Sequence, residues 1–363
     1  MSGTSGEDAF APTYVQAREK FFAAAQTAGL AVQSDVHPLK GRDGETLAMD
    51  VVREGPDDAP SVLLVTSACH GIEGFCGSGV QVALLRDAAW HRQVRESGVA
   101  VVYVHALNPH GFSWWRRVTQ EGVDLNRNFQ DFSQPLPMNP EYDALADALV
   151  PAEWPPLPEV QQVLLHHMQT HGPDATQAVI TRGQYAHPQG LFFGGHGPTW
   201  SNLAVRRMLR TQATRCRRLG WIDLHTGLGP SGHGERIFAG SNDAAALARA
   251  RGWWGDAVTS IYDGSSSSAL LTGLMWSAAV QECAQAEYTG IALEYGTVAM
   301  MEVIDALRGD HWLAAHAPAD AAIAAPIKQR IRDAFYTDTA AWKQRVLEQA
   351  FEAAGQAVQG LSR

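Results

Sequence analysis

The chain has 363 residues, of which 45% are hydrophobic and 18% are charged, and its formal net charge is −10. These proportions are typical of a folded globular protein, and the length is sufficient for one large domain or two small ones. The negative charge disfavours nucleic acid and anionic membranes as main partners. No apolar run reaches the roughly 18 residues that a membrane-spanning helix needs.

The N-terminus and the cysteines both favour a cytoplasmic location. The first 20 residues have no basic start followed by an apolar stretch, so we expect no secretory signal. The four cysteines form no CxxC pair, and we expect free thiols in a reducing compartment. Cys69 stands beside His70, but a small buried residue that closes a strand is the favoured interpretation.

The first third of the chain alternates between helix and strand. Residues 10–30 have a helical pattern, and residues 32–55 predict a hairpin. A wholly apolar strand follows at 59–70, then a helix at 74–94 and a second buried strand at 98–109. Strand, helix, strand in this order is the crossover unit of a parallel or mixed sheet.

The same alternation continues after a proline-rich segment. Residues 131–160 contain seven prolines, and we interpret them as an insertion over the surface because strands of the same character resume afterwards. Later strands are expected at 177–184, 218–229, 234–241 and 290–297, and helices at 199–217, 243–258, 275–284, 300–317 and 338–358. We therefore predict a single α/β domain over residues 1–363, with a mixed, largely parallel central sheet flanked by helices.

Two histidines and a glutamate at strand ends form the candidate metal site. Catalytic groups in such sheets gather where the strands end. His70 and Glu73 follow the first apolar strand, three residues apart at a helix start, so both side chains point to one side. A catalytic zinc site uses three protein ligands and keeps one position for water. An HxxE pair alone recurs by chance, but His225, which follows Asp223 at the end of another apolar strand, would complete the set.

The segment 108–129 and Glu294 supply further candidate catalytic groups. The segment contains Arg116, Arg117 and Arg127, and guanidinium groups suit both carboxylates and developing oxyanions. The alternative interpretation of any single arginine here is that it is solvated or forms an ion pair at the surface. Glu294 ends an apolar strand, where it would either face water or act as a general base for a hydrolytic reaction.

These elements together resemble a known family. The sequence contains HxxE, NPxG, DLNRN, a strand-end DLHTG and a strand-end glutamate, in this order over 70–294. This order resembles the signature of the M14-type zinc carboxypeptidase superfamily, which includes the aspartoacylase and succinylglutamate desuccinylase branch. The tail over 304–350 resembles a bacterial branch called DUF2817. The resemblance implies a zinc-carboxypeptidase-like (phosphorylase/hydrolase-like) fold and one zinc ion per chain.

The resemblance also implies a metal-binding role for four residues. His70, Glu73 and His225 match the zinc ligands of the family. Asp124, in the VDLNRN element, matches the carboxylate that orients the first histidine, a common partner of a metal-bound imidazole.

Four further residues match the groups that act on the substrate. Asn126 and Arg127 match the pair that binds the terminal carboxylate of the substrate. Arg117 matches the arginine that polarises the scissile carbonyl, and Arg116, which follows a tryptophan, is the alternative. Glu294 matches the general base.

The sequence departs from the family pattern in two places. The family tyrosine that closes over the substrate has its nearest candidate in Tyr262, which lies further upstream of the catalytic glutamate than the family pattern predicts, and we exclude it from the site. The gap between the two halves of the site is long, and loops at 131–160 and 183–200 account for it. These loops are expected to line the rim of the cleft and set specificity, with His187 and His196 as ordinary loop histidines.

The favoured function is zinc-dependent hydrolysis of amide bonds. The substrate would be a small peptide or an N-acyl amino acid with a free carboxylate, and carboxypeptidase-like activity is favoured because NPHG and DLNRN look closer to that branch. N-acyl amino acid deacylation is the first alternative. A non-catalytic binding protein is the second, which the presence of Glu294 beside a full ligand set disfavours. A serine hydrolase has little support, because the serine-rich stretch 264–270 is no G-x-S-x-G elbow.

Overall fold

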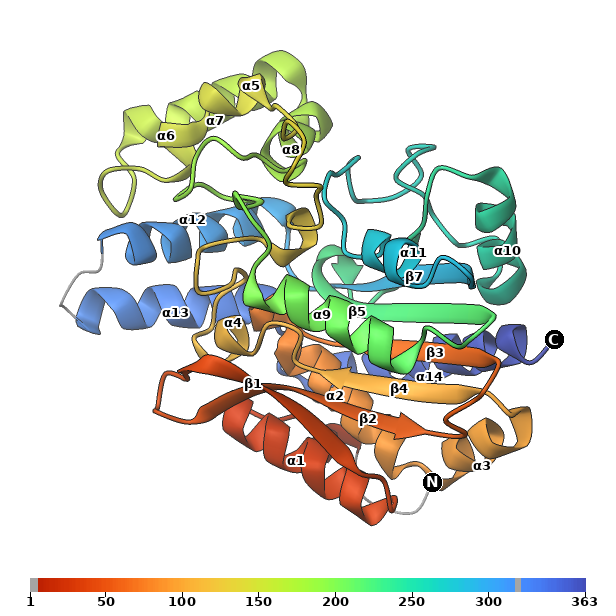
Figure 1. The fold of residues 1–363 in the computed structure, drawn as a ribbon. Coiled ribbons are helices and arrows are strands. Elements are labelled where there is room, and N and C mark those ends of the chain that lie inside the picture. Colours follow the sequence, from red (N-terminus) through yellow and green to blue (C-terminus); the bar gives the residue numbers. More distant parts are fainter. Residues whose placement is uncertain (1–5, 317–320) are drawn as a thin grey trace.

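A seven-stranded mixed sheet forms the centre of the computed structural model, which describes residues 6–316 and 321–363 (Figure 1). The strand order is β1-β2-β4-β3-β5-β7-β6. The strands are β1 (Val32–Lys40), β2 (Thr46–Glu54), β3 (Ser61–Thr66), β4 (Ala100–His105), β5 (Arg218–Ser231), β6 (Gly234–Phe238) and β7 (Glu287–Gly296). The neighbours β4, β3, β5 and β7 are parallel, whereas β1, β2 and β6 are antiparallel to their neighbours. The predicted mixed, largely parallel sheet is therefore confirmed.

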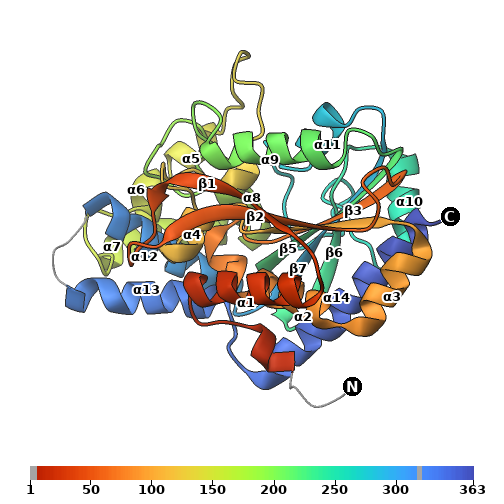
Figure 2. The same ribbon diagram turned by 60° about the horizontal axis from the view of Figure 1, so that its bottom comes forward.

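Helices cover both faces of this sheet. On one face lie α1 (Tyr14–Thr27), α2 (Gly74–Arg86), α3 (Ala88–Ser97) and α14 (Ala340–Leu361), and on the other lie α9 (Trp200–Gln212) and α11 (Ser277–Glu282) (Figure 2). Every residue of β3 and β4 is buried. Strands that are covered on both faces have this continuous apolar character, which is why their sequences show no alternation.

Outside the proline-rich region, the remaining helices are α10 (Ala244–Trp254), α12 (Met300–His316) and α13 (Ala321–Phe335), with the short η1 (Gly6–Ala9), η2 (Gly71–Glu73), α4 (Pro109–Ser113) and η3 (Leu125–Arg127). α10 packs on β7 and α14, whereas α12 and α13 pack on each other at the opposite side of the molecule (Figure 1). The helix α13 was not expected from the sequence. The helix predicted at 300–317 is α12, and residue 317 lies outside the described residues. Within the described ranges, none of the helices combines the length and apolarity that a membrane crossing requires.

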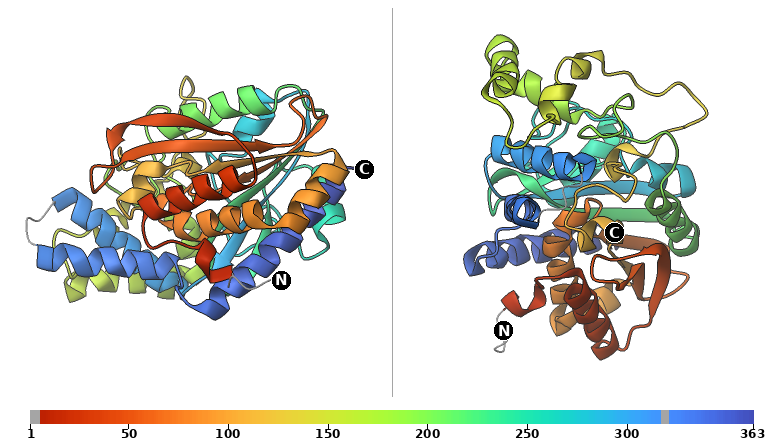
Figure 3. Two further views of the ribbon diagram at one scale, coloured as in Figure 1. Left: turned by 90° about the horizontal axis from the view of Figure 1, so that it is seen from below. Right: turned by 90° about the vertical axis from the view of Figure 1, so that its left-hand side faces the viewer.

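The proline-rich region forms a group of helices of its own. It contains α5 (Pro140–Asp143), α6 (Ala146–Leu149), α7 (Pro158–His171) and α8 (Pro173–Thr181). Figure 3 shows α12 between this group and α13. Arg308 of α12 holds the group in place, because its Nη2 donates to the carbonyl oxygen of Ala148 at 2.7 Å.

The prediction of a strand at 177–184 is wrong, because most of this segment belongs to α8. The helix starts with Pro173 at its first turn, and its buried residues are Thr176, Val179 and Ile180. These positions are spaced by three and four residues and form one stripe of a helix. The short apolar run that suggested a strand is thus the buried face of a two-turn helix, which periodicity alone does not distinguish over so few residues.

Candidate metal centre

The HxxE loop is shaped by the end of β3 and by close packing on the NPxG loop. Ala68 has a left-handed backbone (φ 57°), an unusual conformation for alanine that turns the chain just before His70. The N–H of Gly71 donates to the carbonyl oxygen of Arg117 at 3.0 Å. A Cβ on Gly71 would lie 2.1 Å from the carbonyl carbon of Gly111, so only glycine allows the two loops to touch.

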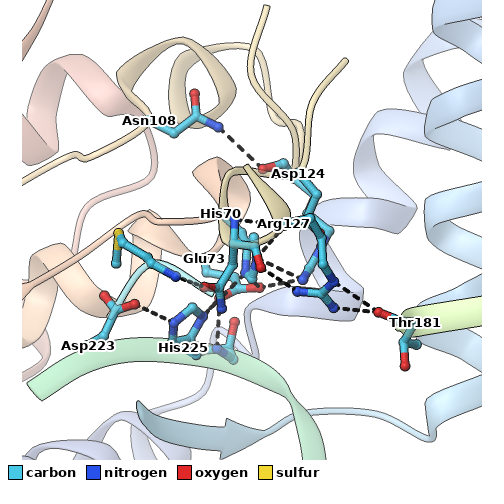
Figure 4. Close-up of polar contacts among 12 residues, drawn as sticks. His70, Glu73, Asn108, Asp124, Arg127, Thr181, Asp223 and His225 are labelled. Carbon is cyan, nitrogen blue, oxygen red and sulfur yellow. Dashed lines mark hydrogen bonds and ion pairs between the residues drawn. The ribbon is translucent and has the colours of Figure 1, made fainter. Parts of the chain in front are cut away.

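The structure brings His70, Glu73 and His225 together in the interior (Figure 4). His70 and His225 are each 3% exposed and Glu73 is 1% exposed. The carboxylate of Glu73 contacts both histidines, with 2.8 Å between Oε1 and His70 Nδ1 and 2.9 Å between Oε2 and His225 Nδ1. The two Nδ1 atoms are 3.3 Å apart. One nitrogen from each imidazole and one carboxylate therefore converge on a single point.

The bonding of His225 tests whether these groups fit a metal ion. Its Nε2 donates to Asp223 Oδ2 at 2.6 Å, and Thr66 holds the other oxygen of Asp223. In the neutral imidazole this leaves a lone pair on Nδ1, which faces an acceptor oxygen of Glu73. Two acceptors at 2.9 Å require a cation between them, either a proton or a metal ion. The two histidines and one glutamate are a donor set that zinc accepts in catalytic sites.

The charges around His225 and Glu73 agree with this arrangement. Burial alone would lower the pKa of His225, but Asp223 and Glu73 outweigh it and raise that pKa well above its usual value. Burial would raise the pKa of Glu73, but His70 and His225 hold it far below its usual range. The site therefore keeps a carboxylate ionised in the interior and attracts positive charge.

Arg117 lies against the outer side of the same cluster. Its Nε donates to Asp124 Oδ2 at 3.0 Å and its Nη1 donates to Glu73 Oε1 at 2.9 Å. Its Nη2 is 2.8 Å from His70 Nε2, and Asp124 Oδ1 is 3.2 Å from the same nitrogen. That nitrogen can bond only one of them at a time, and a metal on Nδ1 would leave Nε2–H for Asp124. Arg117 is thus the cation closest to the candidate ligands and also lines the adjacent pocket.

Arg116 is directed elsewhere. Its Nε donates to Asp310 Oδ2 at 2.9 Å, and Lys328 Nζ reaches the other oxygen of Asp310 at 2.6 Å. Asp310 is fully buried, and although burial would raise its pKa, the two cations hold it well below the usual range. The guanidinium of Arg116 therefore belongs to an ion pair between the loop and α12. Of the two alternatives, the structure places Arg117 at the candidate centre.

Glu294 faces the centre from β7. In the β5–β7 ladder it stands directly opposite His225, and its Oε1 accepts a hydrogen bond from the N–H of Leu228 at 3.0 Å. Burial and the nearby charge of Glu73 raise the pKa of Glu294 to about 7. A carboxyl group with such a pKa exchanges protons near neutral pH, as a general acid or base must.

Asn126 and Arg127 lie on η3 at the same pocket. Asn126 Oδ1 accepts from the N–H of Met275 at 2.9 Å. Arg127 is 2% exposed, and its Nε and Nη2 donate to the carbonyl oxygen of Thr181 at 3.0 and 2.6 Å, while Nη1 donates to the carbonyl of Asn126. Three of its five N–H groups are engaged, so two are left for a ligand.

One pocket connects most of these groups, with about 1120 Å³ of empty space when the solvent at its opening is included. Its polar part contains His70, Arg117, Asn126, Arg127, His225 and Glu294. Most of the other lining residues are apolar, and they come from the sheet, from the segment 261–276 and from α12; they include Trp221, Ile237, Ala292, Leu271, Leu274, Met275, Val303 and Leu307. A concave apolar pocket with a few converging polar groups is the usual form of a small-molecule site.

Several residues that the sequence highlighted lie elsewhere. His187 Nε2 contacts Asp143 at 2.8 Å and His196 Nε2 contacts the carbonyl of Tyr185 at 2.8 Å, and neither lines the pocket among the described residues. The hydroxyl of Tyr262 donates to the carbonyl of Gly240 at 2.9 Å, also outside the lining. These three residues have local structural partners.

The serine-rich stretch 264–270 forms part of the pocket wall. Ser267 donates to Glu235 through both its hydroxyl and its N–H, the latter at 3.1 Å, and Thr259 Oγ1 donates to the same carboxylate at 2.5 Å. Glu235 stands opposite Glu294 in the β6–β7 ladder. The stretch is therefore fixed to the sheet beside the candidate base, and Ser268 lines the pocket.

Cys69 lies within 4.8 Å of the ligand atoms of Asp223 and His225. It is fully buried, and burial, reinforced by Asp223, raises the pKa of its thiol well above the usual value. A protonated thiol is a poor metal ligand. We therefore interpret Cys69 as a small buried residue that packs beside the candidate metal site, and not as a ligand.

Asp223 is the important polar residue to which the sequence analysis gave no role, although it stands two residues before His225. We expect Asp223→Asn to lower the affinity of the candidate site for a metal ion by about 10–100-fold, because the amide no longer holds the Nε2–H of His225 as a carboxylate does. Competition of the purified protein with a chromophoric chelator measures this. The same substitution at the exposed Asp256 should leave the affinity unchanged.

Known structures share this fold. The structure of thrombin-activatable fibrinolysis inhibitor has a TM-score of 0.52 at 11% identity, with 96% of this chain and 74% of that chain covered. Bovine thrombin-activatable fibrinolysis inhibitor, solved in complex with tick carboxypeptidase inhibitor, has a TM-score of 0.50 at 10% identity, with 99% of both chains covered. Carboxypeptidase A from Helicoverpa armigera is a more distant match, on which the fold assignment does not depend, with a TM-score of 0.43 at 13% identity and 89% of this chain and 73% of that chain covered.

At the level of sequence, no curated protein matches the chain. Residues 10–349 match the family described as "Protein of unknown function (DUF2817)". The match covers most of the chain and includes every candidate site residue. The chain therefore belongs to the DUF2817 family and has a carboxypeptidase-like fold.

Proposed function

We propose that the protein is a zinc-dependent hydrolase of amide bonds with carboxypeptidase-like activity. The observation that carries the proposal is the position of Glu294. This carboxyl group, with a pKa raised to about 7, lies opposite His225 in the sheet and lines the same pocket as His70 and His225, which converge with Glu73. A mere binding site has no need of a buried group that exchanges protons beside a candidate metal centre.

The residues of the chain divide the chemistry among them. A zinc ion held by His70, Glu73 and His225 would acidify a water molecule and polarise the scissile carbonyl. Glu294 takes the proton of the attacking water and delivers it to the leaving nitrogen. With the Nε2–H of His70 donating to Asp124, Arg117 uses two of its five N–H groups on Glu73 and Asp124, and the other three are available to the developing oxyanion.

The substrate is proposed to be a small peptide or an N-acyl amino acid with a free carboxylate. The two unused N–H groups of Arg127 bind that carboxylate, with Asn126 beside it. The apolar surface formed by Ala292 and Ile237 accepts the side chain of the residue that carries the carboxylate. The four cysteines are free and buried, which supports our proposal of a cytoplasmic location.

Deacylation of N-acyl amino acids is the second candidate function. The hydroxyl of Tyr262, the nearest candidate for the tyrosine of classical carboxypeptidases, is bound to Gly240 and lies outside the pocket lining. This observation favours a reaction that needs no such tyrosine. The resemblance noted above includes the aspartoacylase branch, which lacks that tyrosine.

The role of Arg127 tests the proposed recognition of a carboxylate. We expect Arg127→Lys to raise KM for carboxylate substrates by about 10-fold or more. A planar guanidinium can bond the carbonyl of Thr181 and a carboxylate at the same time, whereas the single ammonium group of lysine cannot reach both. Steady-state kinetics on a peptide and on its C-terminal amide measures the effect. The amide should be a poor substrate for the wild type, and the variant should discriminate less between the two. Equal KM values for peptide and amide in the wild type would contradict the assignment, and Arg182→Lys is the matched control.

A further inference from the structure

The floor of the pocket is built from side chains that alternate along β7. Glu294, Ala292, Gly290 and Tyr288 are two residues apart and point to the same face of the sheet. Ala292 and Gly290 leave a trough between the candidate base at one end and the tyrosine at the other. The Cα atoms of Glu294 and Gly290 are about 13 Å apart along the strand, because four residues separate them and each adds a rise of ~3.3 Å.

The sides of this trough come from the neighbouring strands. Trp221 of β5 stands opposite Gly290, and Ile237 of β6 stands opposite Ala292. The indole N–H of Trp221 is already used, because it donates to Thr66 Oγ1 at 2.8 Å. Asp223 of β5 stands opposite Ala292, but its two oxygens already bond Thr66 and His225, so the rest of the trough is apolar and has a flat aromatic side.

The hydroxyl of Tyr288 closes the far end. A Cβ on Gly290 would lie 2.2 Å from this oxygen. The hydroxyl therefore lies directly above the glycine, and any larger residue at position 290 would collide with it. Tyr288 lines the pocket, yet its hydroxyl oxygen is buried and has no hydrogen-bond partner in the part of the chain that the structure describes. A buried hydroxyl without a partner is costly, and because such groups are rare in native proteins, each one calls for a functional or structural explanation.

We propose that Tyr288 determines specificity, by forming a hydrogen bond with the phenol of a substrate tyrosine whose ring lies in the trough. A planar ring fits between Trp221 and Ile237 over the small Ala292, and a phenol reaches the far end with a group that both donates and accepts. The inference rests on the proposed function, in which Arg127 holds the carboxylate of the same residue. It applies equally to a peptide that ends in tyrosine and to an N-acyl tyrosine.

Binding of the free amino acids tests this inference without turnover. Calorimetric titration of the zinc-loaded, full-length protein compares L-tyrosine with L-phenylalanine, which differ only in the hydroxyl. We expect tyrosine to bind at least about 10-fold more tightly, because the phenol satisfies a hydroxyl that is otherwise unpaired. In Tyr288→Phe the ratio of the two affinities should fall to about one. In Tyr262→Phe, which removes a hydroxyl outside the pocket lining, the ratio should persist.

The outcomes separate this inference from the proposed function. Equal affinities in the wild type, a preference that survives in Tyr288→Phe, or binding of neither amino acid would each overturn the role of Tyr288. Hydrolysis of peptides and N-acyl amino acids that end in tyrosine is assayed in parallel. A tyrosine preference that depends on Tyr288, without any hydrolysis, would refute the proposed function and still support the inference.

Discussion

Replacing Glu294 with alanine or glutamine should lower kcat by about 10²–10⁴-fold while the protein keeps its zinc. The carboxylate is the only group proposed to move the proton from water to the leaving nitrogen, and general acid–base catalysis typically contributes a factor of this size. Glu294 bonds the N–H of Leu228 and is not one of the converging ligands. The loss should therefore appear in kcat and not in metal content, as measured by steady-state kinetics and elemental analysis of the same samples.

A matched control separates this effect from a general loss of charge. Glu19→Gln changes an exposed glutamate on α1, far from the pocket in sequence and in the fold, and should leave kcat unchanged. Glutamine at 294 retains an acceptor for the Leu228 N–H, so the backbone there should keep its conformation. Retention of more than about a tenth of kcat in both Glu294 variants would show that another group is the base, contrary to our mechanism.

Glu73→Gln should remove zinc binding and activity together. Glu73 contacts both histidines, at 2.8 and 2.9 Å, so its loss separates the two Nδ1 atoms from their common carboxylate. Loss of an outer partner alone typically costs 10–100-fold in affinity, and loss of a direct ligand should exceed about 100-fold. Because zinc stabilises the state that binds it, zinc should raise the Tm of the wild type but not of the variant.

The stability measurement includes its own control. His233→Ala removes an exposed histidine on the β5–β6 turn and should leave the response to zinc intact. An increase in Tm with zinc that is equal in Glu73→Gln and in the wild type would place the metal elsewhere. Chelation of the wild type should reproduce the Tm of the variant in the absence of zinc.

The strands that carry the site could be predicted because each is a short apolar run that ends in polar residues. β3 is wholly buried and leads to His70, and β5 is buried up to His225, so local hydrophobicity was sufficient. The expectation that such ends lie together follows from the parallel arrangement of β3, β5 and β7. The family resemblance then supplied the roles, which spacing alone did not.

Other features depend on contacts that are distant in sequence and have no local pattern. Arg116 and Arg117 are adjacent and alike, and what separates them is Asp310, 194 residues away on α12. Arg127 depends on the carbonyl of Thr181, which ends a helix that was expected to be a strand. In the sequence, Tyr288 is indistinguishable from any other tyrosine in a strand, and nothing local indicates that its hydroxyl is unpaired. Only the tertiary packing shows that it closes the pocket.

The central claim is tested most directly by a product assay on metal-free protein to which zinc is returned. The protein is freed of metal with a chelator, titrated with zinc, and incubated with a mixture of short peptides and N-acyl amino acids, and the products are identified by mass spectrometry. The account predicts that release of single C-terminal residues begins with the first equivalent of zinc and is absent in Glu294→Ala. Release of amino acids from the N-acyl compounds alone would assign the second candidate function. No release from either class at full zinc occupancy, or equal release by Glu294→Ala, would contradict the account.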